Sequence, residues 1–143
     1  MNTVIGQYPD FFSAVVLQNP VISVGEMASV SDIPDWAYAE FGISFGPRSL
    51  LTSDIFEKLQ KASPIAHVDA VKAPVLLLVG DIDQRVPPSQ SKIYYHALKG
   101  RGKEVEMLMF PGDGHSLDSV ETELVSWETI RNWFVRFGKR WWD

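Results

Sequence analysis

Two turns of this sequence carry side chains that could work together in acid–base chemistry. One turn follows the apolar run at residues 74–79 and holds Asp81 and Asp83. The other follows the apolar run at residues 105–110 and holds His115, with glycines nearby that let the turn carry the ring away from the backbone. A carboxylate that accepts a hydrogen bond from an imidazole fixes its tautomer and stabilises the imidazolium, as general-base catalysis requires.

Simpler interpretations of these residues remain open. Asp83 could cap its own turn or pair with Arg85, and His115 could be a solvated turn residue. Asp81 is the competing carboxylate. A metal site built from the two aspartates and the histidine is conceivable, but no HExxH or Cys/His spacing supports it. The remaining histidines are interpreted as structural or surface residues: His67 and His96.

Three short apolar runs must position the two turns. They lie at residues 14–17, 74–79 and 105–110, and are rich in Val, Leu and Met. Runs of this length are typical of strands buried on both faces of a parallel sheet. Because reactive groups collect beyond the carboxyl ends of strands in open α/β sheets, we expect a carboxylate of the first turn and His115 of the second to meet above the sheet.

Helical patterns alternate with the apolar runs. One begins at Pro87-Pro88 and stops at Gly100. The last segment of the chain carries a single apolar stripe of the kind that a core-facing helix has: Val120, Leu124, Trp127, Ile130, Trp133, Phe134 and Phe137. The alternation predicts an α/β domain with parallel strands, flanking helices and right-handed crossovers. Residues 31–47 are predicted to form a loop with one helical turn.

Composition narrows the class of protein. The 143 residues carry a net charge of −5, and no Lys/Arg run forms a patch, which argues against a nucleic-acid partner. The chain has no cysteine, so disulfides and thiolate catalysis are excluded. No apolar run approaches the ~20 residues of a membrane span, and no signal pattern opens the chain. We therefore expect a soluble cytoplasmic domain.

Several segments together resemble the acylaminoacyl-peptidases, which belong to the prolyl oligopeptidase group of serine peptidases. The likeness runs along nearly the whole chain and rests on these segments: Ile5-Gly6-Gln7-Tyr8-Pro9, Asn19-Pro20-Val21-Ile22, Ser31-Asp32-Ile33-Pro34-Asp35-Trp36, Lys61-Ala62-Ser63-Pro64-Ile65, residues 80–87, Tyr94-Tyr95-His96-Ala97-Leu98-Lys99 and Gly114-His115. The order of aspartate before histidine is also that of the α/β-hydrolases, whose triad runs Ser…Asp…His.

The resemblance implies a fold and an activity. The family's triad aspartate falls on Asp83 and its histidine on His115. Family members combine a β-propeller with an α/β-hydrolase domain and release an N-acylated amino acid from a blocked peptide. They need no cofactor, are cytosolic and are often oligomeric. We therefore expect a cytoplasmic enzyme that acts on N-acylated peptides.

The family's nucleophile lies in a Gly-x-Ser-x-Gly elbow upstream of the segment that resembles Ile5–Pro9. Here the chain opens with Met1-Asn2-Thr3-Val4 instead. Residues 1–143 are accordingly expected to form a single partial domain, the C-terminal half of an α/β-hydrolase fold, without the elbow or the propeller. Such a chain holds the Asp and His of the triad but not the Ser, and is predicted to be inactive alone.

One literal match to the elbow motif occurs at residues 42–46, with Ser44 in its centre. An elbow serine needs a buried strand before it and a helix directly after it. A polar, helix-like stretch precedes Ser44 and Pro47 follows it, so the match is interpreted as a coincidence.

Other functions are also compatible with the sequence. The chain could be a truncated isoform without catalytic activity, a binding module that contacts a full-length partner through the aromatic loop at residues 36–45 and the Trp141-Trp142 tail. A separate chain could instead supply the elbow. The apolar run at residues 14–17, if it lies at the edge of the sheet, predicts self-association.

Overall fold

A three-stranded parallel sheet forms the centre of the molecule. The computed structural model describes residues 4–138, and its strands are β1 (Val15–Gln18), β2 (Val75–Gly80) and β3 (Val105–Phe110) in the order β1-β2-β3. The register aligns Val15 with Val75, and Val75 with Val105. The prediction of three parallel strands is confirmed, with the first two strands displaced by one residue from the apolar runs.

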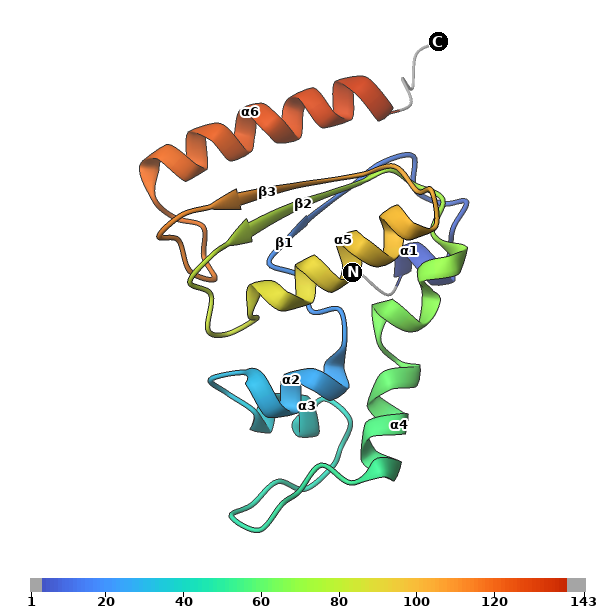
Figure 1. Ribbon diagram of the computed structural model, residues 1–143, viewed down its shortest axis with the longest axis vertical. Coiled ribbons are helices and arrows are strands. Elements are labelled where there is room, and N and C mark those ends of the chain that lie inside the picture. The colour runs from blue at the N-terminus through green and yellow to red at the C-terminus, as the bar shows by residue number, and fades with distance from the viewer. Residues whose placement is uncertain (1–3, 139–143) are drawn as a thin grey trace.

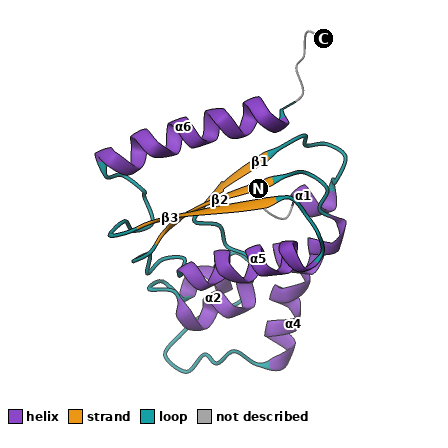
Figure 2. Cartoon of the chain, turned by 45° about the horizontal axis from the view of Figure 1, so that its top comes forward, coloured by secondary structure: helices purple, strands orange, loops and turns teal. Residues whose placement is uncertain are grey.

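Helices cover both faces of the sheet. Helix α6 (Val120–Phe137) lies on one face and α5 (Pro88–Gly100) on the other, as Figure 1 and Figure 2 show. All six residues of β2 are buried, and their side chains alternate between two cores. Leu77 packs in the core that includes Tyr94 of α5, whereas Leu76 and Leu78 pack in the core that includes Trp133 of α6.

The crossover between β1 and β2 forms a small helical lobe beside the carboxyl ends of the strands. Its helices are α2 (Val24–Val30), α3 (Asp35–Ala39) and α4 (Ser53–Lys61). They share a core with one residue of the turn after β2, Val86. The single helical turn predicted within residues 31–47 is α3. Two further short elements are α1 (Val4–Gln7) and the 3-10 helix η1 (Pro64–Ala70).

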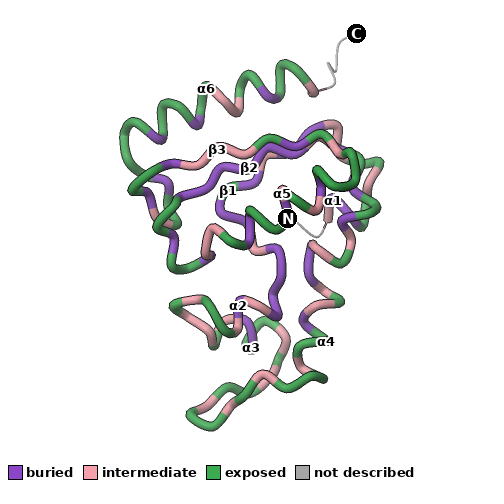
Figure 3. Tube along the Cα trace, in the orientation of Figure 1, coloured by how far each residue is buried: buried purple, intermediate pink, exposed green. Residues whose placement is uncertain are grey.

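The apolar stripe predicted for the last helix is only partly turned toward the sheet. Figure 3 shows α6 mostly in the colour of exposed residues. Trp133 is buried, but Val120, Leu124 and Trp127 are 76 %, 68 % and 66 % exposed. The face that lies toward the sheet carries Thr122, Ser126 and Trp133 instead. Two contacts hold it there, because Trp133 packs in the core with Leu76 and Leu78 and the hydroxyl of Thr122 donates a hydrogen bond to the buried Asp113 carboxylate.

No helix between residues 4 and 138 is both long and apolar enough to cross a membrane. The predicted contact residues Trp141 and Trp142 lie outside the described residues.

Candidate active site

The turns after β2 and β3 bring the predicted acid and base together. Nδ1 of His115 lies 2.8 Å from Oδ2 of Asp83. The Asp83 side chain is fully buried, whereas the His115 side chain is 47 % exposed. Because a carboxylate only accepts hydrogen bonds, Nδ1 carries the proton of the neutral ring, and Nε2 is the nitrogen available for proton transfer.

The second oxygen of Asp83 is also occupied. Oδ1 accepts hydrogen bonds from the backbone N–H groups of Arg85 at 2.8 Å and Val86 at 2.9 Å. The turn therefore fixes the carboxylate through one oxygen and leaves the other for the histidine. Asp83 caps its own turn, as the simpler interpretation held, and it contacts His115 as well.

The Arg85 guanidinium pairs with a different carboxylate. Its Nε donates to Oδ1 of Asp32 at 2.7 Å, across the gap between the β2 turn and the helical lobe. The pair is exposed, and its hydrogen bond lowers the pKa of Asp32 and raises that of Arg85. The Arg85 side chain thus pairs with Asp32, and Arg85 contacts Asp83 through its backbone N–H.

The competing carboxylate, Asp81, has a structural partner. Its Oδ1 accepts a hydrogen bond from the backbone N–H of Gly112 at 2.7 Å, which joins the turn after β2 to the turn after β3. A second link runs from the backbone N–H of Ile82 to the carbonyl of Asp113 at 3.2 Å. These bonds hold the turn that carries His115 against the turn that carries Asp83.

The His115 turn also passes directly over the end of β2. A Cβ atom placed on Gly80 would lie 2.3 Å from the carbonyl oxygen of Gly114 and 2.5 Å from that of Asp113. Such distances are far below van der Waals contact, so only glycine allows this approach of the two backbones.

Asp113 ties the same turn to the start of α6. Its buried carboxylate accepts hydrogen bonds from the hydroxyls of Thr122 and, at 2.9 Å, Ser119. The Thr122 bond is the main cause that lowers the pKa of Asp113, and burial opposes it. Ser119 also accepts from the backbone N–H of Thr122 as the N-cap of α6. The helix and the His115 turn are thus fastened at one point.

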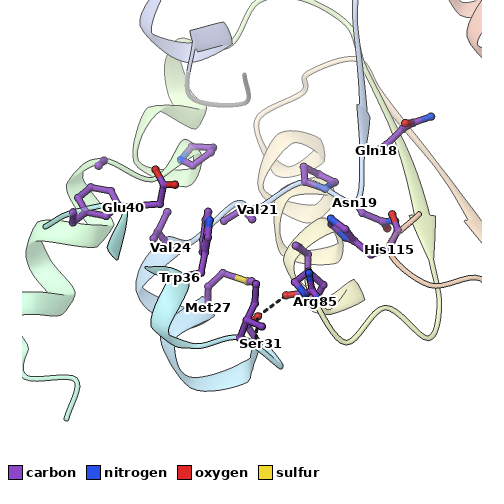
Figure 4. Close-up of a pocket in the computed structure, with 16 residues that line it drawn as sticks. Gln18, Asn19, Val21, Val24, Met27, Ser31, Trp36, Glu40, Arg85 and His115 are labelled. Atoms are coloured by element: carbon purple, nitrogen blue, oxygen red, sulfur yellow. Dashed lines mark hydrogen bonds between the residues drawn. The ribbon is translucent and has the colours of Figure 1, made fainter. Parts of the chain in front are cut away.

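A cavity of about 720 Å³ opens beside the exposed histidine. Figure 4 shows Met27 and Trp36 of the lobe facing it from one side, and Asn19 and His115 at the other. Much of its wall is apolar, with the charged side chains of Glu40 and Arg85 among the lining residues. A ligand held there would lie against the ring that can move a proton.

The literal elbow serine is elsewhere. Ser44 lines a separate hollow formed by residues 44–49, and neither Asp83 nor His115 lines it. The serine that shares the large cavity with His115 is Ser31, which the sequence reading did not single out. Its hydroxyl donates to the carbonyl of Arg85 at 2.8 Å and accepts from the N–H of Ile33, as in a turn.

The two other histidines lie away from this site. His67, in η1, packs so closely on Gly6 that a Cβ there would lie 2.5 Å from the histidine's own Cβ. His96 is exposed on α5 and contacts the edge of Tyr95. Within residues 4–138, no group of three His, Asp or Glu side chains is placed to hold a metal ion.

Comparisons with known proteins agree on one family. The model of the prolyl oligopeptidase family matches residues 1–140. The acylamino-acid-releasing enzyme of Mus musculus is 41 % identical over 129 residues, which are 90 % of this chain and 18 % of that enzyme. The Arabidopsis thaliana enzyme of the same name is 40 % identical over 139 residues, or 94 % of this chain and 18 % of its own length.

The solved structures agree with the sequence relatives. The acylaminoacyl peptidase of Pyrococcus horikoshii superposes with a TM-score of 0.81 at 27 % identity, over 98 % of this chain and 22 % of that one. This likeness confirms the predicted α/β-hydrolase fold. The chain spans about a fifth of the length of these relatives.

Proposed function

From the premise that this chain belongs to the prolyl oligopeptidase family of serine peptidases, we propose that it supplies the acid–base pair of a catalytic triad. The observation that carries the proposal is the 2.8 Å contact between His115 and the buried Asp83. The reaction is the release of an N-acylated amino acid from a blocked peptide. The acylamino-acid-releasing enzymes at about 40 % identity support that choice of substrate.

The proposed mechanism assigns one role to each side chain. Nε2 of His115 takes the proton of a serine hydroxyl while the serine oxygen attacks the scissile carbonyl, and then gives it to the leaving amine. Water repeats the sequence on the acyl-enzyme. The Asp83 side chain accepts the hydrogen bond from Nδ1–H and stabilises the imidazolium. The cavity beside the ring receives the acylated residue, and its apolar wall favours an apolar side chain.

The nucleophile is proposed to come from outside residues 1–143, and the chain alone to be inactive. Three observations support this part of the proposal. Ser44 lies in a separate hollow, and the Ser31 hydroxyl is engaged in its own turn. The relatives are about five times as long as this chain and so hold residues that it does not cover. We further propose that residues 1–143 are one partial catalytic domain that works in the cytoplasm without a cofactor.

The alternative of a binding module without activity stays a prediction. In the aromatic loop at residues 36–45, which this alternative takes as the contact surface, some of the side chains pack inside the molecule. Tyr38 is buried, and Trp36 packs against the core of the lobe. That packing does not favour the alternative over the triad.

Labelling with a fluorophosphonate tests the proposal, because the reagent reports an activated serine whatever the substrate preference. The 143-residue chain alone should form no adduct. Mixed with a segment that carries the serine elbow, it should yield labelling of the elbow serine and cleavage of an N-acetylated peptide, but not of the same peptide with a free amino terminus.

Two histidine variants provide the specificity control. His115→Ala should abolish labelling and cleavage, whereas the matched variant His96→Ala, on the exposed face of α5, should retain both. Asp83→Asn should lower kcat by about 10⁴-fold, because the ring loses its correct tautomer. An adduct on Ser31 or Ser44 of the chain alone, lost in His115→Ala, would overturn the assignment of the nucleophile.

A further inference from the structure

Asn19 stands at the point where the strands and the His115 turn converge. It follows β1 directly, and its backbone N–H donates to the carbonyl of Leu78 in β2 at 2.9 Å. It is 4 % exposed. Its φ of 40° lies in the left-handed region, which asparagine tolerates better than other residues with a side chain. A buried residue in this conformation, beside a candidate active site, requires an explanation.

The side-chain amide of Asn19 binds three backbone groups. Nδ2 donates to the carbonyl oxygens of His115 at 2.9 Å and Gly114 at 3.2 Å. Oδ1 accepts from the N–H of Gly80, the last residue of β2, at 2.9 Å. Both N–H groups and one lone pair are therefore used, and one side chain joins the end of β2 to the turn that carries the histidine.

We infer that Asn19 is the positioning residue for His115, an inference that rests on the proposed function. The bonds to the carbonyls of Gly114 and His115 fix the backbone on both sides of the Cα atom that carries the ring, and this ring contacts Asp83. Figure 4 shows Asn19 beside His115. The backbone N–H of Asn19 bonds to β2, and its side chain bonds to Gly80 at the end of that strand. Asn19 therefore holds the His115 turn against the strand that leads into the Asp83 turn.

The chemistry of the site explains why an amide is required. An aspartate fits the same volume and conformation and can still accept from Gly80, but it has no proton to donate to the two carbonyls. A glycine adopts the positive φ without strain but offers no side chain. Asn19→Asp therefore removes the two donated hydrogen bonds and keeps the bond from Gly80, whereas Asn19→Gly removes all three and keeps the backbone conformation.

The test is NMR spectroscopy of the 143-residue chain with a ¹⁵N-labelled histidine ring, which needs no nucleophile. In the wild-type chain, His115 should show the Nδ1–H tautomer and a downfield proton on that nitrogen. Asn19→Asp and Asn19→Gly should both lose this signature. Asn19→Asp should keep slow exchange of the Gly80 amide proton, and Asn19→Gly should not. The matched variant Asn132→Asp, at an exposed position of α6, should change neither signal.

A measurement on the wild-type chain covers the case in which a variant fails to fold. The side-chain amide protons of Asn19 should exchange at least about tenfold more slowly than those of the exposed Asn132. Equal exchange rates would overturn the inference, and so would a folded Asn19→Asp chain that retains the Nδ1–H tautomer. Failure of the fluorophosphonate test with a normal tautomer signal would instead overturn the proposed function alone.

Discussion

A methyl group at Gly80 is expected to separate the two halves of the candidate acid–base pair. In Gly80→Ala, the new Cβ would start 2.3 Å from the Gly114 carbonyl oxygen, and contacts below 3.0 Å essentially do not occur. The turn must therefore recede by about 0.7 Å or more at the residue next to His115. If His115 moves by this amount along the hydrogen bond, the 2.8 Å distance from its Nδ1 to Oδ2 of Asp83 lengthens to about 3.5 Å, the outer limit of a hydrogen bond.

Two magnitudes follow from that displacement. Overpacking of this kind lowers the free energy of unfolding by about 1–3 kcal/mol. A misplacement of about 1 Å at a catalytic group costs about 10²-fold in rate. The first is measured by thermal or urea unfolding of the chain. The second is measured by peptide cleavage in the reconstituted protein, and by the His115 tautomer signal in the chain alone.

Gly100→Ala is the matched control, because the added Cβ meets no atom within 4 Å beyond its chain neighbours and the backbone of its own helix, and the residue ends helix α5. Alanine is the better helix former, so this variant should be as stable as the wild type or slightly more stable. The steric argument fails if Gly80→Ala unfolds at the same denaturant concentration as Gly100→Ala and keeps the His115 signature.

Three further expectations concern the packing around the site. The folded-state pKa of Asp113 lies below its ordinary 3.8, so the ionised carboxylate stabilises the fold above about pH 4, and this contribution is lost as the pH falls through the lowered pKa. Thr122→Val should therefore lower the Tm more at pH 7 than at about pH 2. An equal loss at both pH values would contradict the role of the hydroxyl. Burial raises the pKa of Tyr94 to about 12, and its hydroxyl has no hydrogen-bond partner among residues 4–138. Tyr94→Phe should therefore stabilise the chain by about 1 kcal/mol in urea unfolding, and a loss of stability would indicate a bound partner. In urea unfolding, Trp133→Ala should lower the free energy of unfolding by about 3–5 kcal/mol, because the side chain is buried. Trp127→Ala, on the exposed side of the same helix, should lower it by at most about 0.5 kcal/mol. Equal losses would show that the helix is turned differently.

The sequence predicted the strands and the acid–base pair because both depend on local patterns. The apolar runs correspond to β1, β2 and β3, and turns that follow neighbouring parallel strands must lie at the same edge of the sheet. The choice between Asp81 and Asp83 depended on the family resemblance, because both carboxylates are in one turn. The structure places one against Gly112 and the other against His115.

The parts that the sequence did not predict depend on contacts between distant segments. The three hydrogen bonds of the Asn19 side chain span 61, 95 and 96 residues, and an amide after a strand carries no local sign of such partners. The face that α6 turns toward the sheet depends on its packing against β2 and on its contact with Asp113, which precedes the helix. Helix α4 could have been found, since Thr52 is its N-cap and Ile55 and Leu59 follow at helical spacing.

Val86 gives the turn after β2 two attachments. Its backbone N–H donates to the Asp83 carboxylate, while its side chain is buried in the core of the helical lobe with Met27 and Leu59. A hinge motion that swings the lobe away from the sheet would pull on the carboxylate as it widens the cavity. Through Val86, such a displacement of the lobe would act both on the cavity and on the carboxylate that holds the His115 ring. A bound molecule that draws the lobe inward would set the ring as it closes the cavity.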